Sequence, residues 1–115
     1  MAESKLRDLS MDFFVKIIKL CDNIKGHHFL ANQLERSATS TGVNIHEVNY
    51  AHGKADFVAK LQIALKECYE TEYWIELFVK SDLIEREMAK EIFTKCGTIR
   101  RMLIASINTA KDGRV

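Results

Sequence analysis

The chain has 115 residues, of which 47% are hydrophobic and 29% are charged, and its formal net charge is +1. This length fits one domain with a sizeable core, and the near-neutral charge differs from that of a globally basic nucleic-acid-binding protein. No run approaches the roughly 20 apolar residues of a membrane-spanning helix, and the first residues lack the pattern of a secretory signal peptide.

The first predicted helix spans residues 8–24. The chain contains no proline, which favours long uninterrupted helices, and Gly26 follows the helix as a typical C-terminal stop. Apolar residues recur along this segment at helical spacing. We expect this set to face the core: Met11, Phe14, Ile17, Ile18, Cys21 and Ile24.

The second predicted helix spans residues 30–51. Its apolar seam alternates in steps of four and three residues, which keeps one stripe towards a partner helix: Leu34, Ala38, Thr41, Ile45 and Val48. The same helix contains the weak helix formers ATSTG, residues 38–42. One interpretation is that small side chains let a second helix approach closely, and the alternative is a backbone that contacts a ligand.

The third predicted helix, residues 55–80, has the strongest pattern in the chain. Its seam repeats over three heptads: Phe57, Leu61, Ala64, Cys68, Thr71, Ile75 and Phe78. Gly53 marks the break before it, and Ser81 with Asp82 the break after it.

The fourth predicted helix spans residues 85–110, and Asp82 with Glu85 matches a capping box at its start. Its expected inward residues are Met88, Ile92, Cys96, Ile99, Leu103 and Ile107. Short connections make consecutive helices antiparallel neighbours. The sequence therefore predicts an all-α fold, a single up-down-up-down four-helix bundle over residues 1–115.

Four segments of the run RSATSTGVNIHEVNYAHGKADFVAKLQIALKECYETEYWIELF, residues 36–78, form a recognisable composite. They are Ser40 with Gly42, then Asn44–Glu47, Lys54–Phe57 and Leu65–Trp74. Together they resemble the four-helix-bundle family named for the 23S rRNA intervening sequence. The chain departs from that pattern at Val48, where many members have Gly or Ala, and at Gly53, where a Ser commonly caps the third helix.

The resemblance implies a bacterial protein that assembles into a ring, a homopentamer in similar proteins. Some relatives are encoded inside rRNA intervening sequences. One distinct, markedly basic branch acts as the accessory partner of a retroelement reverse transcriptase.

The sequence offers no set of residues for a reaction. No Glu-x-x-His occurs, so a di-iron site lacks its ligands, and neither His46 nor His52 has a spacing to a cysteine that supports nucleophilic catalysis. The three cysteines, Cys21, Cys68 and Cys96, are widely spaced in apolar surroundings without a CxxC pattern. We expect reduced, buried thiols in a cytoplasmic protein that is not an enzyme and needs no metal or cofactor.

A group of polar residues on the second and third helices predicts a buried, hydrogen-bonded network: Arg36, Asn44, Glu47, Glu67 and Glu70. A carboxylate inside a bundle without a partner costs several kcal/mol, so an interior Glu47 must be paired. We expect that pairing, within or between subunits, to fix helix register or subunit orientation.

Apolar residues of the third helix that lie off its seam predict an oligomer interface: Ile63, Tyr73, Trp74 and Leu77. Large exposed aromatic and aliphatic groups usually mark an interaction surface. The alternative is that this group packs under the loops of the bundle.

The C-terminal part is basic, since residues 92–115 carry five basic and one acidic group, whereas residues 66–91 carry four and eight. The candidate phosphate contacts are Lys95, Arg100, Arg101, Lys111 and Arg114. A ring would repeat these cations around its axis and so form a phosphate-binding surface. The alternative is a solvated C-terminus whose cations complement the helix dipole.

Two functions follow from these features. The first is a non-catalytic, ring-forming scaffold whose partner is RNA, DNA or a nucleic-acid-processing protein. The alternative is a pure protein–protein interaction module, which the small net charge favours.

Overall fold

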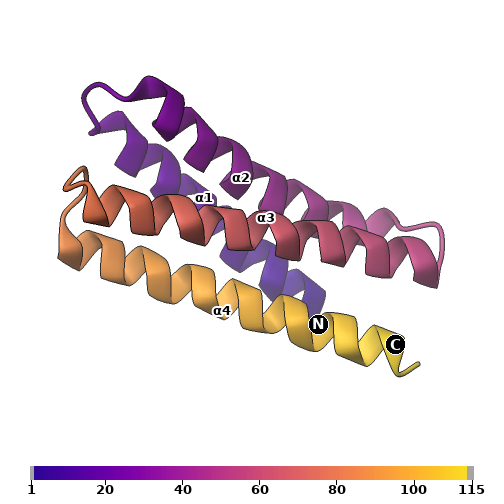
Figure 1. Cartoon of the computed structure of the whole chain (residues 1–115). Helices are drawn as coiled ribbons and strands as arrows, with labels where there is room; N and C mark the ends of the chain where they lie inside the picture. The colour runs from indigo at the N-terminus through magenta and orange to yellow at the C-terminus, as the bar shows by residue number, and fades with distance from the viewer. Residues whose placement is uncertain (1, 114–115) are drawn as a thin grey trace.

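The computed structural model describes residues 2–113 and consists of four long helices joined by short connections. They are α1 (Ala2–Asp22), α2 (His28–Glu47), α3 (Lys54–Lys80) and α4 (Arg86–Lys111), and the 3-10 turn η1 (Val48–Tyr50) continues α2. Consecutive helices run antiparallel, so both ends of the chain lie at one end of an elongated molecule of 46 × 22 × 19 Å (Figure 1). The prediction of four helices in an all-α fold is confirmed.

Each helix packs against two others, in the order α1, α2, α3, α4 and back to α1. This arrangement puts α1 and α3 at opposite corners of the bundle. No helix within residues 2–113 combines the length and apolarity that crossing a membrane requires.

The largest differences from the predicted helix boundaries are at the start of α1 and at the end of α2. Helix α1 begins at Ala2, six residues before the predicted start, because the preceding residues are good helix formers and place Leu6 in the core. Helix α2 ends at Glu47, and residues 48–50 tighten into the 3-10 turn, a frequent ending of an α-helix.

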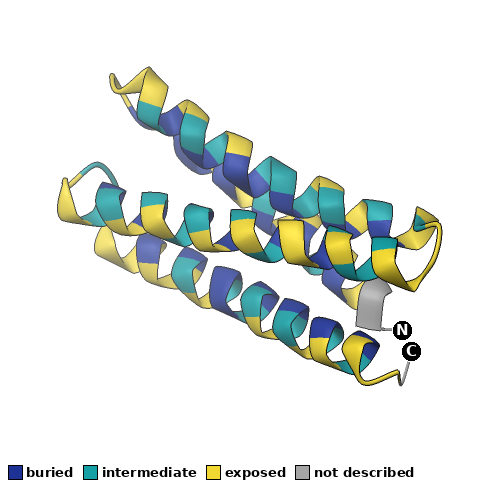
Figure 2. Cartoon of the chain, turned by 45° about the vertical axis from the view of Figure 1, so that its right-hand side comes forward, coloured by how far each residue is buried: buried dark blue, intermediate teal, exposed yellow. Residues whose placement is uncertain are grey.

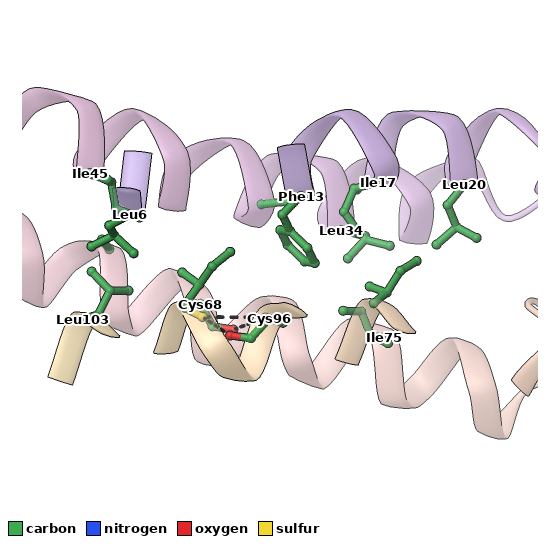
Figure 3. Close-up of a cluster of buried hydrophobic side chains, with 14 of the residues drawn as sticks. Leu6, Phe13, Ile17, Leu20, Leu34, Ile45, Cys68, Ile75, Cys96 and Leu103 are labelled. Carbon is green, nitrogen blue, oxygen red and sulfur yellow. Dashed lines mark hydrogen bonds between the residues drawn. The ribbon is translucent and has the colours of Figure 1, made fainter. Parts of the chain in front are cut away.

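The core is built from the seams predicted for α2, α3 and α4. Their central members are fully buried, including Leu34, Ile45, Ile75 and Leu103, and Figure 3 shows them pointing into the space between the helices. Phe57 is only partly buried at the end of the α3 seam. The four- and three-residue spacing identified these positions because it follows the geometry of helix packing.

The predicted inward face of α1 is wrong in two of its six residues. Met11 and Ile18 are exposed, whereas Phe13 and Leu20 are buried. Helix α1 carries apolar residues around much of its circumference, so periodicity alone does not choose between neighbouring stripes. Met88, at the start of α4, is also exposed rather than inward. Figure 2 shows the buried residues confined to the inner side of each helix.

The capping box predicted from Asp82 and Glu85 does not form. Asp82 adopts a left-handed conformation (φ 59°), and Glu85 precedes α4 without a side-chain cap. The amides of Leu83 and Asp82 donate to the carbonyls of Phe78 (2.9 Å) and Val79 (3.1 Å). This is a Schellman motif, so Asp82 ends α3 instead of starting α4.

Candidate interaction surface

Three polar contacts join α2 and α3 along their length. In the buried centre, the Thr71 hydroxyl donates to Ser37 Oγ over 2.9 Å. Nearer one end, Lys60 Nζ lies 2.9 Å from a Glu47 carboxylate oxygen. The third contact joins Arg36 to the carboxylates of α3. Because the helices are antiparallel, this register puts Val43 level with Ile63.

Arg36 is the centre of a polar cluster on this pair of helices. Its guanidinium donates to Glu67 over 3.2 Å, to Glu70, and to the Gln33 side-chain oxygen over 3.2 Å. The indole nitrogen of Trp74 donates to Glu70 over 3.0 Å. This hydrogen bond and the Arg36 charge lower the pKa of Glu70, which therefore stays ionised at neutral pH.

The prediction of one buried network needs two corrections. Arg36 is exposed and the carboxylates of its cluster are only partly covered, so the cluster lies at the surface of the chain. Glu47 is paired, as expected, but with Lys60 and away from Arg36. Asn44 belongs to neither group, since its amide donates to the Ser40 carbonyl of its own helix over 2.8 Å.

The four residues predicted for an oligomer interface differ in exposure. Ile63 is 45% exposed and Tyr73 is 60% exposed. Trp74 and Leu77 are partly buried, and Trp74 packs against the core while its ring meets Tyr73 edge-on at 5.1 Å. Tyr73 and Ile63 thus offer apolar area that no described residue covers.

Helical spacing gathers these residues and the Arg36 cluster on one surface, which we call the α2/α3 face. On α2, Phe29 and Val43 share the side of Arg36, and both are exposed. The members of the face are Phe29, Arg36, Ser40, Val43, Ile63, Glu67, Glu70, Tyr73, Trp74 and Leu77. Between its ends, Thr39 and Ser40 line a shallow depression on α2, so small side chains of the ATSTG run also face outward.

A second apolar surface was missed by the sequence analysis. Met11, Val15 and Ile18 form an exposed stripe along α1, which we call the α1 stripe. Two of its residues were assigned to the core. Since α1 and α3 occupy opposite corners of the bundle, the α1 stripe is separate from the part of the α2/α3 face that α3 contributes.

The structure does not bring the predicted phosphate contacts together. Arg100 donates to Glu72 over 2.9 Å and is partly buried, and Arg101 and Lys111 are exposed at different levels of α4. Lys95 instead lines a groove between α1 and α4 with Lys16 and Lys19. Arg114 lies outside the described residues.

The thiols are buried, as predicted. Burial, together with the neighbouring carboxylate of Glu35, raises the pKa of Cys21 to about 12, so this sulfur stays protonated. Cys68 and Cys96 are in contact in the core, which their separation of 28 residues did not reveal.

Comparisons with known proteins agree on one family. The family model described as 23S rRNA-intervening sequence protein matches residues 2–105. A crystal structure of a protein with unknown function from the S23 ribosomal protein family of Bacteroides thetaiotaomicron VPI-5482 is 38% identical, with a TM-score of 0.89. The match covers 95% of this chain and 100% of that one. No curated protein matches the chain.

Proposed function

The chain belongs to the 23S rRNA-intervening sequence protein family, and from this premise we propose that it is a non-catalytic scaffold that assembles head to tail into a ring. The observation that carries the proposal is the presence of two separate exposed apolar surfaces, the α1 stripe and the α2/α3 face. A head-to-tail interface joins two different surfaces of identical chains, and it closes into a ring when the rotation between them permits.

The α2/α3 face has the composition of an energetically important interface. Tyr73, Trp74 and Arg36 belong to the three residue types most enriched among residues that dominate binding energy. The Arg36 cluster has its hydrogen bonds already formed, so covering it leaves few polar groups unsatisfied. The α1 stripe of a neighbouring chain supplies apolar area from Met11, Val15 and Ile18.

The test is the mass of the protein in solution. Multi-angle light scattering should give a multiple of the 13.2 kDa chain, and Trp74 fluorescence should resist quenching by solutes. Met11→Lys and Ile63→Lys should each lower the mass towards that of one chain, because a lysine ammonium is costly to bury in an apolar contact. Met88→Lys replaces an exposed methionine outside both surfaces and should leave the mass unchanged. A wild-type particle of one chain would overturn the proposal.

The partner we propose for the ring is a protein that acts on nucleic acid. The small net charge of +1 argues against nucleic acid as the main ligand. A partner retained on the immobilised wild-type protein after nuclease treatment of a lysate, and lost from Met11→Lys, would fit a protein partner that needs the assembly.

Direct binding of nucleic acid is the second candidate, favoured by one observation. Lys16, Lys19 and Lys95 line the same groove between α1 and α4, although Asp12 also lines it and Lys16 pairs with Glu91 at 3.0 Å. Binding of structured RNA whose affinity falls steeply with salt, and is weakened by Lys19→Gln and Lys95→Gln, would support it. Absence of binding at low salt would exclude it.

A further inference from the structure

Cys68 on α3 and Cys96 on α4 bring two thiols into contact in the centre of the bundle. Their sulfur atoms are 3.6 Å apart, and each side chain is 1% exposed (Figure 3). Each thiol also approaches the backbone carbonyl of the other cysteine, at 3.6 and 3.8 Å. The two helices therefore come close together at this level.

One turn further along each helix lies a charged residue, Glu72 after Cys68 and Arg100 after Cys96. Arg100 Nε donates to a Glu72 carboxylate oxygen over 2.9 Å, and both side chains are largely covered. The two sulfurs and a Glu72 oxygen lie within 4.8 Å of one another. Among the side chains of residues 5–113, this is the one group of three such ligand atoms.

From this geometry we propose that Cys68, Cys96 and Glu72 form a binding site for a divalent thiophilic cation of the Zn²⁺ class, with Arg100 as the residue that positions the carboxylate. The site is independent of the proposed scaffold function. The sequence predicts no metal site, because its cysteines do not form a CxxC pair and no Glu-x-x-His occurs. The repeated offset of four residues, from each cysteine to a charged residue, was the available signal.

The sulfur separation fits tetrahedral coordination. With a Zn–S distance of about 2.3 Å, two thiolates at the tetrahedral angle lie about 3.8 Å apart. The observed 3.6 Å requires only a small adjustment of the two side chains. Glu72 supplies a third ligand after a modest movement of its carboxylate.

Charge balance lowers the free-energy cost of burying such an ion. Two thiolates neutralise one divalent cation, and Arg100 already neutralises Glu72. The occupied site therefore has no net charge, whereas an unbalanced ion in the core would cost several kcal/mol. A monovalent thiophilic cation would leave one uncompensated negative charge, so the balance favours the divalent class.

Binding must release protons. Cysteines bind a cation of this class as thiolates, so its affinity should rise with pH. Uptake should be slow, because the sulfurs become accessible only when the bundle opens locally.

The experiment uses the reduced full-length protein titrated with Co²⁺, whose thiolate complexes absorb through sulfur-to-metal charge transfer. We expect a charge-transfer band that saturates at one Co²⁺ per chain and is bleached by one equivalent of Zn²⁺. Cys68→Ala and Cys96→Ala should each abolish the band. Cys21→Ala is the matched control, because this third buried cysteine lies on α1 away from the pair, and it should keep the band.

Glu72→Gln should weaken Co²⁺ binding about tenfold or more, and Arg100→Gln should weaken it to a lesser extent, since it acts through Glu72. Glu76→Gln, which alters an exposed carboxylate one turn away, should have no effect. Circular dichroism establishes that each variant is folded, and thermal unfolding gives a second readout, since Zn²⁺ should raise the midpoint of the wild type and not that of Cys68→Ala.

A folded wild-type protein that shows no charge-transfer band in excess Co²⁺ would overturn the proposal. A band that persists in Cys68→Ala, or disappears in Cys21→Ala, would do the same. Loss of ring assembly with an intact band would contradict the scaffold and leave the metal site standing.

Discussion

At the scale of single residues, Gly42 and Gly53 differ in whether the structure requires a glycine at that position. Gly42 lies inside α2, and a methyl group added there would meet only Ser10 Oγ, at an ordinary 3.8 Å. Close packing within the chain therefore does not require glycine at this position. Gly53 precedes α3 with φ 154° and ψ −178°, a conformation that residues with a side chain rarely adopt, and nothing lies within 4 Å of an added methyl group.

These two sites predict changes of opposite sign. Gly42→Ala should raise the free energy of unfolding by about 0.5–1 kcal/mol, because alanine is the better helix former. Gly53→Ala should lower it by about 1–3 kcal/mol through backbone strain alone. Urea unfolding of both variants at one protein concentration checks the pair, and a loss of stability in Gly42→Ala would show that another surface packs against this position.

Glu70 predicts a pH dependence of stability. The Trp74 hydrogen bond and Arg36 lower its pKa in the folded protein below the ordinary value of 4.5. A lowered folded-state pKa stabilises the protein above the unfolded-state pKa, and this contribution disappears as the pH falls through the folded value.

Glu70→Gln should therefore cost about 1 kcal/mol at pH 7, a modest amount because the carboxylate is partly exposed. The difference from wild type should shrink below pH 4.5. Unfolding midpoints measured between pH 3 and pH 7 test this, with the exposed Glu76→Gln as the control. A difference that stays constant across this range would contradict the assigned role of the ionised carboxylate.

At the scale of the elements, the helix ends are where local sequence rules were least reliable. Aspartate is a frequent N-cap residue, yet Asp82 follows the C-terminal end of α3 in a left-handed conformation. The position is fixed by Leu83, which packs partly buried against the core and whose amide bonds back to Phe78. An apolar residue after the left-handed position is a frequent companion of the Schellman motif.

Asp82→Gly should therefore stabilise the protein by about 0.5–1 kcal/mol. Glycine adopts the left-handed conformation without steric cost, and the change also removes a negative charge from a helix C-terminus. Asp82→Asn removes the charge alone and should give a smaller gain. Thermal unfolding of the two variants separates these contributions, and destabilisation by Asp82→Gly would show that the carboxylate has a structural role.

At the scale of the whole molecule, the proposed ring predicts how copies associate through the two apolar surfaces. An interface that pairs the α2/α3 face with itself would have two-fold symmetry, whereas one that pairs it with the α1 stripe is head to tail. The two cases predict different behaviour when defective chains are mixed.

Met11→Lys disrupts the α1 stripe and Ile63→Lys the α2/α3 face, so neither variant alone should form a ring. Mixed in equal amounts, they should form a complex of two chains, because the intact stripe of one meets the intact face of the other. Size-exclusion chromatography with light scattering measures this. A mixture that stays at one chain per particle, or that restores the full ring, would contradict a head-to-tail interface.

Much of the fold followed from the order of residues alone. Seams such as Leu61 to Phe78 were visible because the side chains that pack between helices must recur every three or four residues. The family was visible because its segments are continuous in the chain. The exposed Ile63 and Tyr73 were found because they lie off a seam that was already complete.

Tertiary structure alone decided which apolar stripe of α1 faces inward, since Phe13 and Met11 are equally acceptable to periodicity and only packing against α2 and α4 separates them. It also decided the partners of charged and sulfur-containing groups: Glu47 with Lys60, Arg100 with Glu72, and Cys68 with Cys96. Repetition along a helix is a local property that one segment encodes by itself. A contact between two helices depends on their mutual rotation and register, which arise only when all four pack together.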